Sequence, residues 1–185
     1  MIKIKRFKDP VYGYIDIKEF IISDIVDTSG FQRLRHIIQT SYSPLYSSAV
    51  HNRFVHSLGV YYLGCIAVNT LTENRILFGE IENLERMLEV FELACLLHDI
   101  GHAPFSHTGE EYYLENGERT ELHKRIVELT SDNTLEEEIK GRNYKAAPHE
   151  LMSVIVALKD YGFLFHNDDE KSFFARCITG YFYVK

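Results

Sequence analysis

A helical spacing of apolar residues, present from residue 16 onward, is the feature that most constrains how this chain folds. In two long stretches, apolar side chains recur at intervals of three and four positions. Such intervals place side chains on one face of an α-helix, because one helical turn takes 3.6 residues. Shorter stretches of the same kind follow, so we expect helices at roughly 52–71, 81–97, 149–159 and 170–179. The pattern predicts an all-α fold, with a helical bundle over residues 16–185.

The first fifteen residues follow a period of two instead. Isoleucines alternate with lysines before Pro10, and residues 11–15 form a second short apolar stretch after it. This alternation predicts a short β-hairpin-like element over residues 1–15. We expect Asp16 to cap a short helix directly after it, and Thr28 or Ser29 to cap a second one.

Charge and hydropathy limit the partners and the location. The chain has 185 residues, of which 27 are acidic and 20 basic, and its formal net charge is −7. A negative chain has no general attraction for a polyanion, so nucleic acid is not an expected partner. No stretch approaches the roughly 20 uninterrupted apolar residues of a membrane span, and the first residues contain no signal-peptide run. We therefore expect a soluble, cytoplasmic protein that makes no membrane contact.

Three further features concern the cysteines, an acidic stretch and the last residues. Cys65, Cys95 and Cys177 lie far apart and form no Cys-x-x-Cys pair, which favours free, buried thiols in a reducing compartment. The charged residues 131–147, including three consecutive glutamates, predict a solvated loop with a frayed acidic helix. The aromatic residues 181–183 are expected to pack onto the bundle, to contact another subunit, or to lead into a longer protein.

Histidines are concentrated in two blocks, and these blocks suggest a metal site. The chain has nine histidines, and five of them lie in or beside the segments HNRFVHSLG (residues 51–59) and LLHDIGHAPFSH (residues 96–107). His98 and Asp99 follow an apolar helical run, where burying an imidazole and a carboxylate without a partner is costly. A divalent cation removes that cost, because Mn, Fe, Zn and Mg accept such ligands, and His56 supplies a third donor.

The same blocks contain groups suited to phosphate chemistry. His107 and Glu110 are three positions apart, so the carboxylate can orient the imidazole as it does in a general acid or base. Arg53, three positions before His56, can hold a phosphate group with two hydrogen bonds.

Three segments together resemble one enzyme family. FQRLR (residues 31–35), HNRFVHSLGV (residues 51–60) and HDIGHAPFSH (residues 98–107) are similar to segments of the HD-domain deoxynucleoside triphosphate triphosphohydrolases. An isolated His-Asp dipeptide is weak evidence, whereas three long blocks in the same order are specific. The resemblance spans most of residues 9–159 and implies an HD-domain helical bundle that corresponds to the N-terminal, catalytic part of the family.

The resemblance implies a reaction and a role for each matching residue. The reaction is the hydrolysis of a deoxynucleoside triphosphate to deoxynucleoside and inorganic triphosphate, with a divalent metal ion as cofactor and a homo-oligomer as the assembly. The implied metal ligands are His56, His98 and Asp99, and the implied catalytic residues are His102, His107, Glu110 and His149. The implied substrate contacts are Arg53 for the triphosphate and Gln39 for the deoxyribose, and the implied contacts for a regulatory nucleotide are Asp27, Gln32 and Arg35.

The chain also departs from the family pattern. The family's fourth metal ligand is an Asp in a downstream segment that reads Asp-x-Asp-Arg-Leu-Asp-Tyr, and no such segment follows here. We therefore expect a bundle without the family's C-terminal part, and a metal site with three protein ligands. Two alternatives stay open: another HD phosphomonoesterase or phosphodiesterase, and an inactive module that binds nucleotide or forms oligomers.

Overall fold

α-Helices form most of the computed structural model, which describes residues 3–40, 45, 47–73, 83–114, 118–141 and 146–181. The longer helices are α3 (Arg53–Glu73), α4 (Leu84–Leu97), α5 (Thr120–Thr130), α6 (Asn133–Gly141), α7 (Pro148–Asp160) and α8 (Asp168–Thr179). The short ones are α1 (Glu19–Ile21), the π-helix η1 (Ile22–Val26), α2 (Ser29–Gln32) and the 3-10 helices η2 (Arg33–His36), η4 (Ser106–Tyr113) and η5 (Gly162–Leu164). The expected all-α fold class is confirmed, and the expected start near residue 81 lies outside the described residues.

A two-stranded antiparallel hairpin precedes the helices. Strands β1 (Ile4–Asp9) and β2 (Gly13–Lys18) pair along their whole length. The carboxylate of Asp9 accepts hydrogen bonds from two backbone N–H groups of the turn, at 2.8 and 2.9 Å. Gly13 has a φ of 78°, a left-handed conformation that glycine adopts without strain. The turn therefore has the residues that its geometry requires.

The second strand is longer than the sequence suggests. It continues to Lys18, past the expected end of the hairpin at residue 15. Ile15 and Ile17 both point into the core, so the period of two persists. The expected helix cap at Asp16 is wrong, because this carboxylate pairs with Arg6 across the hairpin at 2.6 Å.

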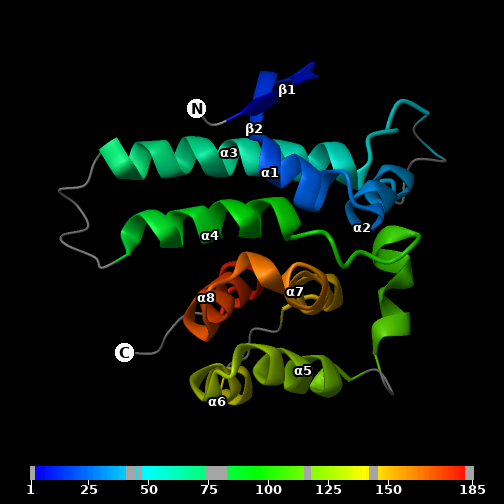
Figure 1. The fold of residues 1–185 in the computed structure, drawn as a ribbon. Helices are drawn as coiled ribbons and strands as arrows, with labels where there is room; N and C mark the ends of the chain where they lie inside the picture. Colours follow the sequence, from blue (N-terminus) through cyan, green and yellow to red (C-terminus); the bar gives the residue numbers. More distant parts are fainter. Residues whose placement is uncertain are drawn as a thin grey trace.

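The helices are stacked in layers behind the hairpin. Figure 1 shows α3 and α4 side by side, with the hairpin outside α3 and with α7 and α8 on the other side of α4. Helices α5 and α6 cover the remaining side of α7 and α8. Gly64 allows α3 to lie close to α4, because a Cβ at this position would be 2.7 Å from Cys95 Sγ. The apolar core between these layers joins all the elements that carry the candidate site.

Helix α3 is unusually apolar. By length and composition alone it could cross a membrane, with a mean hydropathy of 1.3 over its most apolar window, although the sequence shows no uninterrupted apolar run of that length. One third of that window is buried inside the structure. One such helix is weak evidence for a membrane span, because a core helix passes the same test. Here α3 packs against α4, η2 and β2.

The acidic segment is more ordered and more buried than expected. It contains helix α6, in which Leu135 is fully buried and Glu138 is 6% exposed. The expectation of a solvated glutamate run is wrong for Glu138, because Arg176 of α8 donates a hydrogen bond to it at 2.8 Å. A cation from a helix 38 positions away makes this burial possible, and local composition cannot show it.

The aromatic end of the chain begins by packing onto the bundle. Tyr181 is 1% exposed, and its hydroxyl accepts a hydrogen bond from the backbone N–H of Ala146 at 3.3 Å. The aromatic residues that follow Tyr181 lie outside the described residues. For Tyr181 itself, packing onto the bundle is the alternative that the structure supports.

Candidate active site

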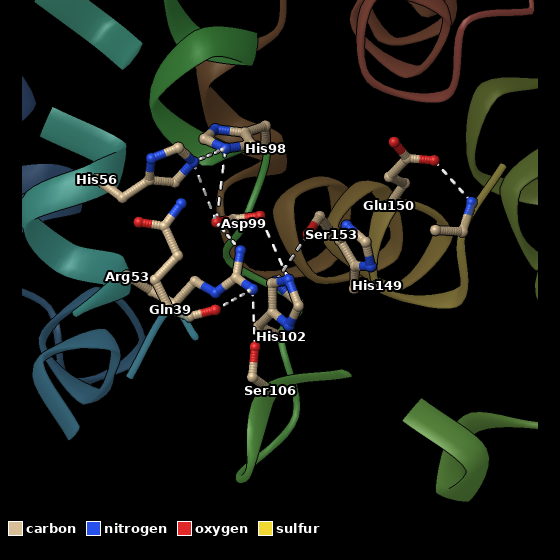
Figure 2. A network of polar contacts seen from close by, with 12 residues as sticks. Gln39, Arg53, His56, His98, Asp99, His102, Ser106, His149, Glu150 and Ser153 are labelled. Carbon is tan, nitrogen blue, oxygen red and sulfur yellow. Dashed lines mark hydrogen bonds and ion pairs between the residues drawn. The ribbon is translucent and has the colours of Figure 1, made fainter. Parts of the chain in front are cut away.

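Two distant helix ends bring the predicted metal ligands together. His56 lies in the first turns of α3, and His98 and Asp99 follow the last residue of α4 (Figure 2). The apolar run of α4 ends at Leu97, so the polar pair emerges where the helix stops. Because α3 and α4 are packed side by side, one ligand atom from each of the three residues lies within 4.8 Å of the others.

The imidazole of His98 is oriented so that its Nε2 can bind a cation. Its Nδ1 lies 2.9 Å from the carbonyl oxygen of Cys95, which only a protonated Nδ1 can use as an acceptor. The Nε2 lone pair is then free and lies 3.2 Å from Nε2 of His56 and 3.5 Å from Oδ2 of Asp99. A hydrogen bond that fixes the tautomer of a metal-binding histidine is common in metal sites.

The protonation states of the cluster fit a divalent cation. Burial lowers the pKa of His56, which favours the neutral imidazole. Burial alone would raise the pKa of Asp99, but electrostatic interactions with His98, Arg53 and His102 bring that pKa below its usual value. Two imidazoles and one carboxylate form a donor set that Zn, Fe and Mn accept. The three side chains present therefore fit such an ion.

A second cluster lies beside the first, around the carboxylate of Glu110. Its Oε1 is 2.5 Å from Nδ1 of His107 and 2.7 Å from Nδ1 of His149. His107 and Glu110 belong to η4, whereas His149 lies in the first turn of α7, so imidazoles from two elements meet at one oxygen atom. His102 stacks on His149 with ring centroids 4.2 Å apart. The four residues could themselves hold a metal ion by distance alone, although both Nδ1 atoms already use Glu110 as their acceptor.

His102 is the most constrained member of this cluster. Its side chain is fully buried, and neither ring nitrogen has a hydrogen-bond partner among the described residues. Burial lowers the pKa of His102 to about 3, so the ring is neutral near pH 7. Its Nε2 lies 3.5 Å from Oδ1 of Asp99, which places His102 between the two clusters.

Arg53 connects the two clusters into one site. One guanidinium nitrogen donates to Oδ2 of Asp99 at 2.7 Å, and the other donates to Oγ of Ser106 at 2.7 Å. The second nitrogen also lies 3.2 Å from Nε2 of His107 and 3.3 Å from the carbonyl oxygen of Gln39. Arg53 is only 5% exposed, so its charge is buried at the centre of the site.

Ser106 is a site residue that sequence reasoning missed. Both Phe105 and Ser106 have a positive φ, of 69° and 54°, which is a costly conformation for residues other than glycine. The left-handed backbone at these two successive residues directs the Ser106 hydroxyl toward Arg53. The serine belongs to the second histidine block, but nothing in the sequence indicates the backbone conformation that places its hydroxyl there.

Gln39, the implied contact for the deoxyribose, lies next to Arg53, because its backbone carbonyl accepts a hydrogen bond from that guanidinium at 3.3 Å. Its side-chain oxygen contacts Nε2 of His51, and its backbone N–H donates to the His51 carbonyl at 3.1 Å. The bridge between Ile38 and Asn52 holds these two segments together. Gln39 is therefore tied to the start of α3, next to Arg53.

The candidate regulatory residues are only partly brought together. Arg35 donates from Nε to Oε1 of Gln32 at 2.7 Å, and its guanidinium lies 3.5 Å from the ring centre of Phe54. Asp27 is exposed and lies 3.9 Å from the ammonium group of Lys5. Gln32 and Arg35 thus form a pair, while Asp27 makes an ionic contact with Lys5 of the hairpin.

A cavity of about 230 Å³ opens beside both clusters. His98 and His149 lie on its wall, together with the carboxylate-bearing Glu150. The remaining lining comes from the apolar faces of α3, α4 and α8 and includes Phe91 and Ile178. The site is therefore bordered by a cavity whose wall comes from α3, α4, α7 and α8.

Comparison with known proteins supports the resemblance found in the sequence. Residues 53–158, more than half of the chain, match the model of the HD domain family. The deoxynucleoside triphosphate triphosphohydrolase SAMHD1 of Mus musculus is 35% identical over 158 residues, which are 82% of this chain and 23% of that protein. The SAMHD1 of Gallus gallus is 44% identical over 105 residues, which are 56% of this chain and 16% of that protein.

A bacterial protein and a solved structure are also similar. The uncharacterized protein YwfO of Bacillus subtilis is 42% identical over 110 residues, which are 59% of this chain and 24% of that protein. A crystal structure of a phosphohydrolase from Bacteroides thetaiotaomicron is 29% identical, has a TM-score of 0.60, and matches 94% of this chain and 34% of its own. The chain thus spans about a quarter or less of the length of these curated relatives. The family match covers the two helix ends that hold the site, so the chain belongs to the HD-domain family and is similar to its deoxynucleoside triphosphate triphosphohydrolases.

Proposed function

We propose that this chain forms the catalytic centre of a metal-dependent phosphohydrolase that converts a deoxynucleoside triphosphate to deoxynucleoside and inorganic triphosphate. The observation that carries this proposal is the position of Arg53, whose guanidinium joins the Asp99 carboxylate of one cluster to His107 of the other. A phosphate group bound at this point can contact the guanidinium of Arg53 and the imidazole of His107. It also lies beside Asp99, one of the predicted metal ligands. Similarity to the deoxynucleoside triphosphate triphosphohydrolases supports a deoxynucleoside as the other part of the substrate.

His56, His98 and Asp99 would hold the metal ion. When bound, the ion supplies Lewis-acid polarisation of a phosphoryl oxygen and lowers the pKa of a bound water. In the overall reaction, one water adds to the α-phosphorus and the bond to the 5′-oxygen breaks. The products are a deoxynucleoside, whose 5′-oxygen gains a proton, and a triphosphate.

The residues of this chain have separate tasks in that reaction. Arg53 offsets the negative charge of the triphosphate, which is worth more in a buried site than in water. Glu110 binds Nδ1 of His107 and of His149, so each ring can exchange a proton through its Nε2. One of these two imidazoles donates the proton that the leaving 5′-oxygen requires. His102 stays neutral beside them and fills the space between the clusters.

The test is product analysis after incubation of each deoxynucleoside triphosphate with the protein and Mn²⁺. We expect intact triphosphate and deoxynucleoside in equal amounts. The variants His98→Ala and Glu110→Gln should reduce triphosphate release by roughly 100-fold or more, because one removes a metal ligand and the other the charge that orients two imidazoles. The matched control is His166→Ala, an exposed histidine outside the site that should leave the rate unchanged.

The products also separate the alternative functions. Stepwise release of single phosphates, or cleavage of phosphate monoesters or cyclic nucleotides in place of triphosphate release, indicates a different HD reaction. Binding of dGTP by metal-free protein, without hydrolysis after Mn²⁺ is added, indicates an inactive nucleotide-binding module. Either result contradicts the proposed reaction.

Homo-oligomer formation and a cytoplasmic location stay predictions from the resemblance and the composition. Light scattering after size-exclusion chromatography, with and without deoxynucleoside triphosphate, measures the oligomeric state. A monomer under both conditions would contradict it. Fractionation of the source cells measures the location.

A further inference from the structure

The turn that carries Asp99 and His102 is held by side chains from three other elements. It follows α4 and continues without regular secondary structure from His98 to Ala103. Within it, two backbone hydrogen bonds link Ile100 N–H to the Leu97 carbonyl and His102 N–H to the Asp99 carbonyl, both at 3.0 Å. These two bonds leave other polar backbone groups of a buried turn to be satisfied from outside.

Each of the remaining groups of residues 100–102 meets a side chain. The carbonyl oxygens of Ile100 and His102 both accept hydrogen bonds from the guanidinium of Arg33, the second at 2.7 Å. The carbonyl between them, that of Gly101, accepts from the Tyr113 hydroxyl at 2.8 Å. The N–H of Gly101 donates to the hydroxyl of Ser153, a residue labelled in Figure 2, at 2.9 Å.

Arg33 makes the largest contribution to this arrangement. It comes from η2, 67 and 69 positions before Ile100 and His102, and it donates hydrogen bonds to the carbonyl oxygens on both sides of Gly101. The carbonyl oxygens of Ile100 and His102 carry like partial charges, and the half-buried guanidinium of Arg33 offsets their repulsion. The planar guanidinium has several N–H donors in a fixed fork, whereas a lysine ammonium reaches one such acceptor well.

We infer that Arg33 is a positioning residue for the metal-binding turn: its fork fixes the backbone of residues 100–102 and thereby sets the positions of Asp99 and His102. Asp99 is a ligand of the candidate metal site, and His102 links that site to the Glu110 cluster. The inference therefore rests on the proposed function, but it concerns the shape of the site and can be tested without substrate.

The first measurement is amide hydrogen exchange in metal-free protein. In Arg33→Met, and also in Arg33→Lys, the amides of Gly101 and His102 should exchange at least about tenfold faster than in the parent, while the α7 amide of Val154 is unchanged. Exchange at Gly101 and His102 that equals the parent's in both variants overturns the inference. Recovery of the parent exchange in Arg33→Lys also overturns it, because charge alone would then suffice.

The second measurement is the affinity for Mn²⁺, determined by isothermal titration without nucleotide. The dissociation constant should rise about 10- to 100-fold in Arg33→Met and nearly as much in Arg33→Lys, as for other residues that orient metal ligands. Tyr113→Phe, which loses one hydrogen bond to the turn, should show a smaller rise.

The matched control is Arg86→Met. Arg86 also binds a carbonyl oxygen, that of Leu164 at 2.6 Å, and a carboxylate of Glu170, but these lie on η5 and α8. The Arg86→Met variant should be less stable than the parent but should bind Mn²⁺ with the same affinity. An equal loss of Mn²⁺ affinity in Arg86→Met and Arg33→Met overturns the specific role of Arg33. If the parent itself binds no Mn²⁺, the proposed function fails, and the exchange data alone decide the role of Arg33.

Discussion

At the scale of single residues, Gly101 is where the metal-binding turn meets the backbone of α7. A Cβ added to Gly101 would lie 2.2 Å from the backbone nitrogen of Ser153. No side-chain movement relieves this contact, because the clash is with main-chain atoms. The glycine thus allows α7, which carries His149, to approach the turn that carries Asp99.

We therefore predict that Gly101→Ala lowers the free energy of unfolding by about 2–3 kcal/mol or more, as expected for overpacking against a rigid backbone. The control is Gly162→Ala, because nothing lies within 4 Å of a Cβ built there and its φ is not left-handed. Urea unfolding of the two variants at neutral pH is the measurement. Equal stability of Gly101→Ala and the parent would show that the two backbones are not in contact.

His102 shows the cost of burying a polar side chain in the core. It is fully buried, and neither ring nitrogen has a hydrogen-bond partner among the described residues. Phenylalanine has a similar shape and no polar atoms to desolvate. We predict that His102→Phe is at least as stable as the parent in urea unfolding, by up to about 1 kcal/mol, while triphosphate release is lost. A clear loss of stability would mean that the ring nitrogens do find partners.

At the scale of elements, one buried cation of α8 binds carboxylates of α6 and of the residue that precedes α6. Arg176 is 3% exposed and donates hydrogen bonds to the carboxylates of Asp132 and Glu138, both at 2.8 Å. Burial alone would raise the pKa of Asp132, but hydrogen bonds from Ser172, Thr134 and Arg176 lower it below its usual value of 3.8. The ionised carboxylate is thus favoured in the folded state.

This lowered pKa makes the contribution of Asp132 dependent on pH. A carboxylate with a lowered pKa stabilises fully above the pKa of the unfolded chain, and its contribution is lost as pH falls through the folded value. We predict that Asp132→Asn is about 1–3 kcal/mol less stable than the parent at pH 7 and that this difference shrinks below pH 3.8. Urea unfolding between pH 7 and pH 2.5 measures it, with the exposed Asp160→Asn as control. A difference in the free energy of unfolding that is constant over this pH range would show that the pKa of Asp132 is not lowered by folding.

At the scale of the whole molecule, three thiols report on the integrity of the bundle. Cys65, Cys95 and Cys177 lie on α3, α4 and α8, and none is in a disulfide. Burial raises the pKa of these thiols to about 12, 11 and 12 respectively. Because the thiolate is the reactive form, all three should be inert near pH 8 while the helices stay packed.

We predict that Ellman's reagent at pH 8 labels the folded protein slowly, and that labelling accelerates with urea in step with the loss of helical circular dichroism. Fully unfolded protein should yield three reactive thiols, which serves as the control. Rapid labelling of any thiol without denaturant would mean that the helices separate locally at that position.

Much of the site could be predicted because its parts are local in sequence. The pairs His98–Asp99 and His107–Glu110 are one and three positions apart, and the apolar spacing places His56 near the start of a helix. Such relations depend on helix geometry and on adjacency, which are properties of short segments. The N-cap at Thr28 was predictable for the same reason, and its side chain does accept a hydrogen bond from the N–H of Phe31.

The sequence by itself determined the helical fold class and the chemical groups of the site, because periodicity and residue type act over a few positions. Only the tertiary structure decided how those groups are connected: Arg53 meets Asp99 across 46 positions, Arg33 holds the turn across nearly 70, and Arg176 buries Glu138 across 38. These contacts arise when whole helices pack. In each one, a charged group loses its contact with water and gains a specific hydrogen-bond partner. The partner belongs to another element, so its identity is settled by packing.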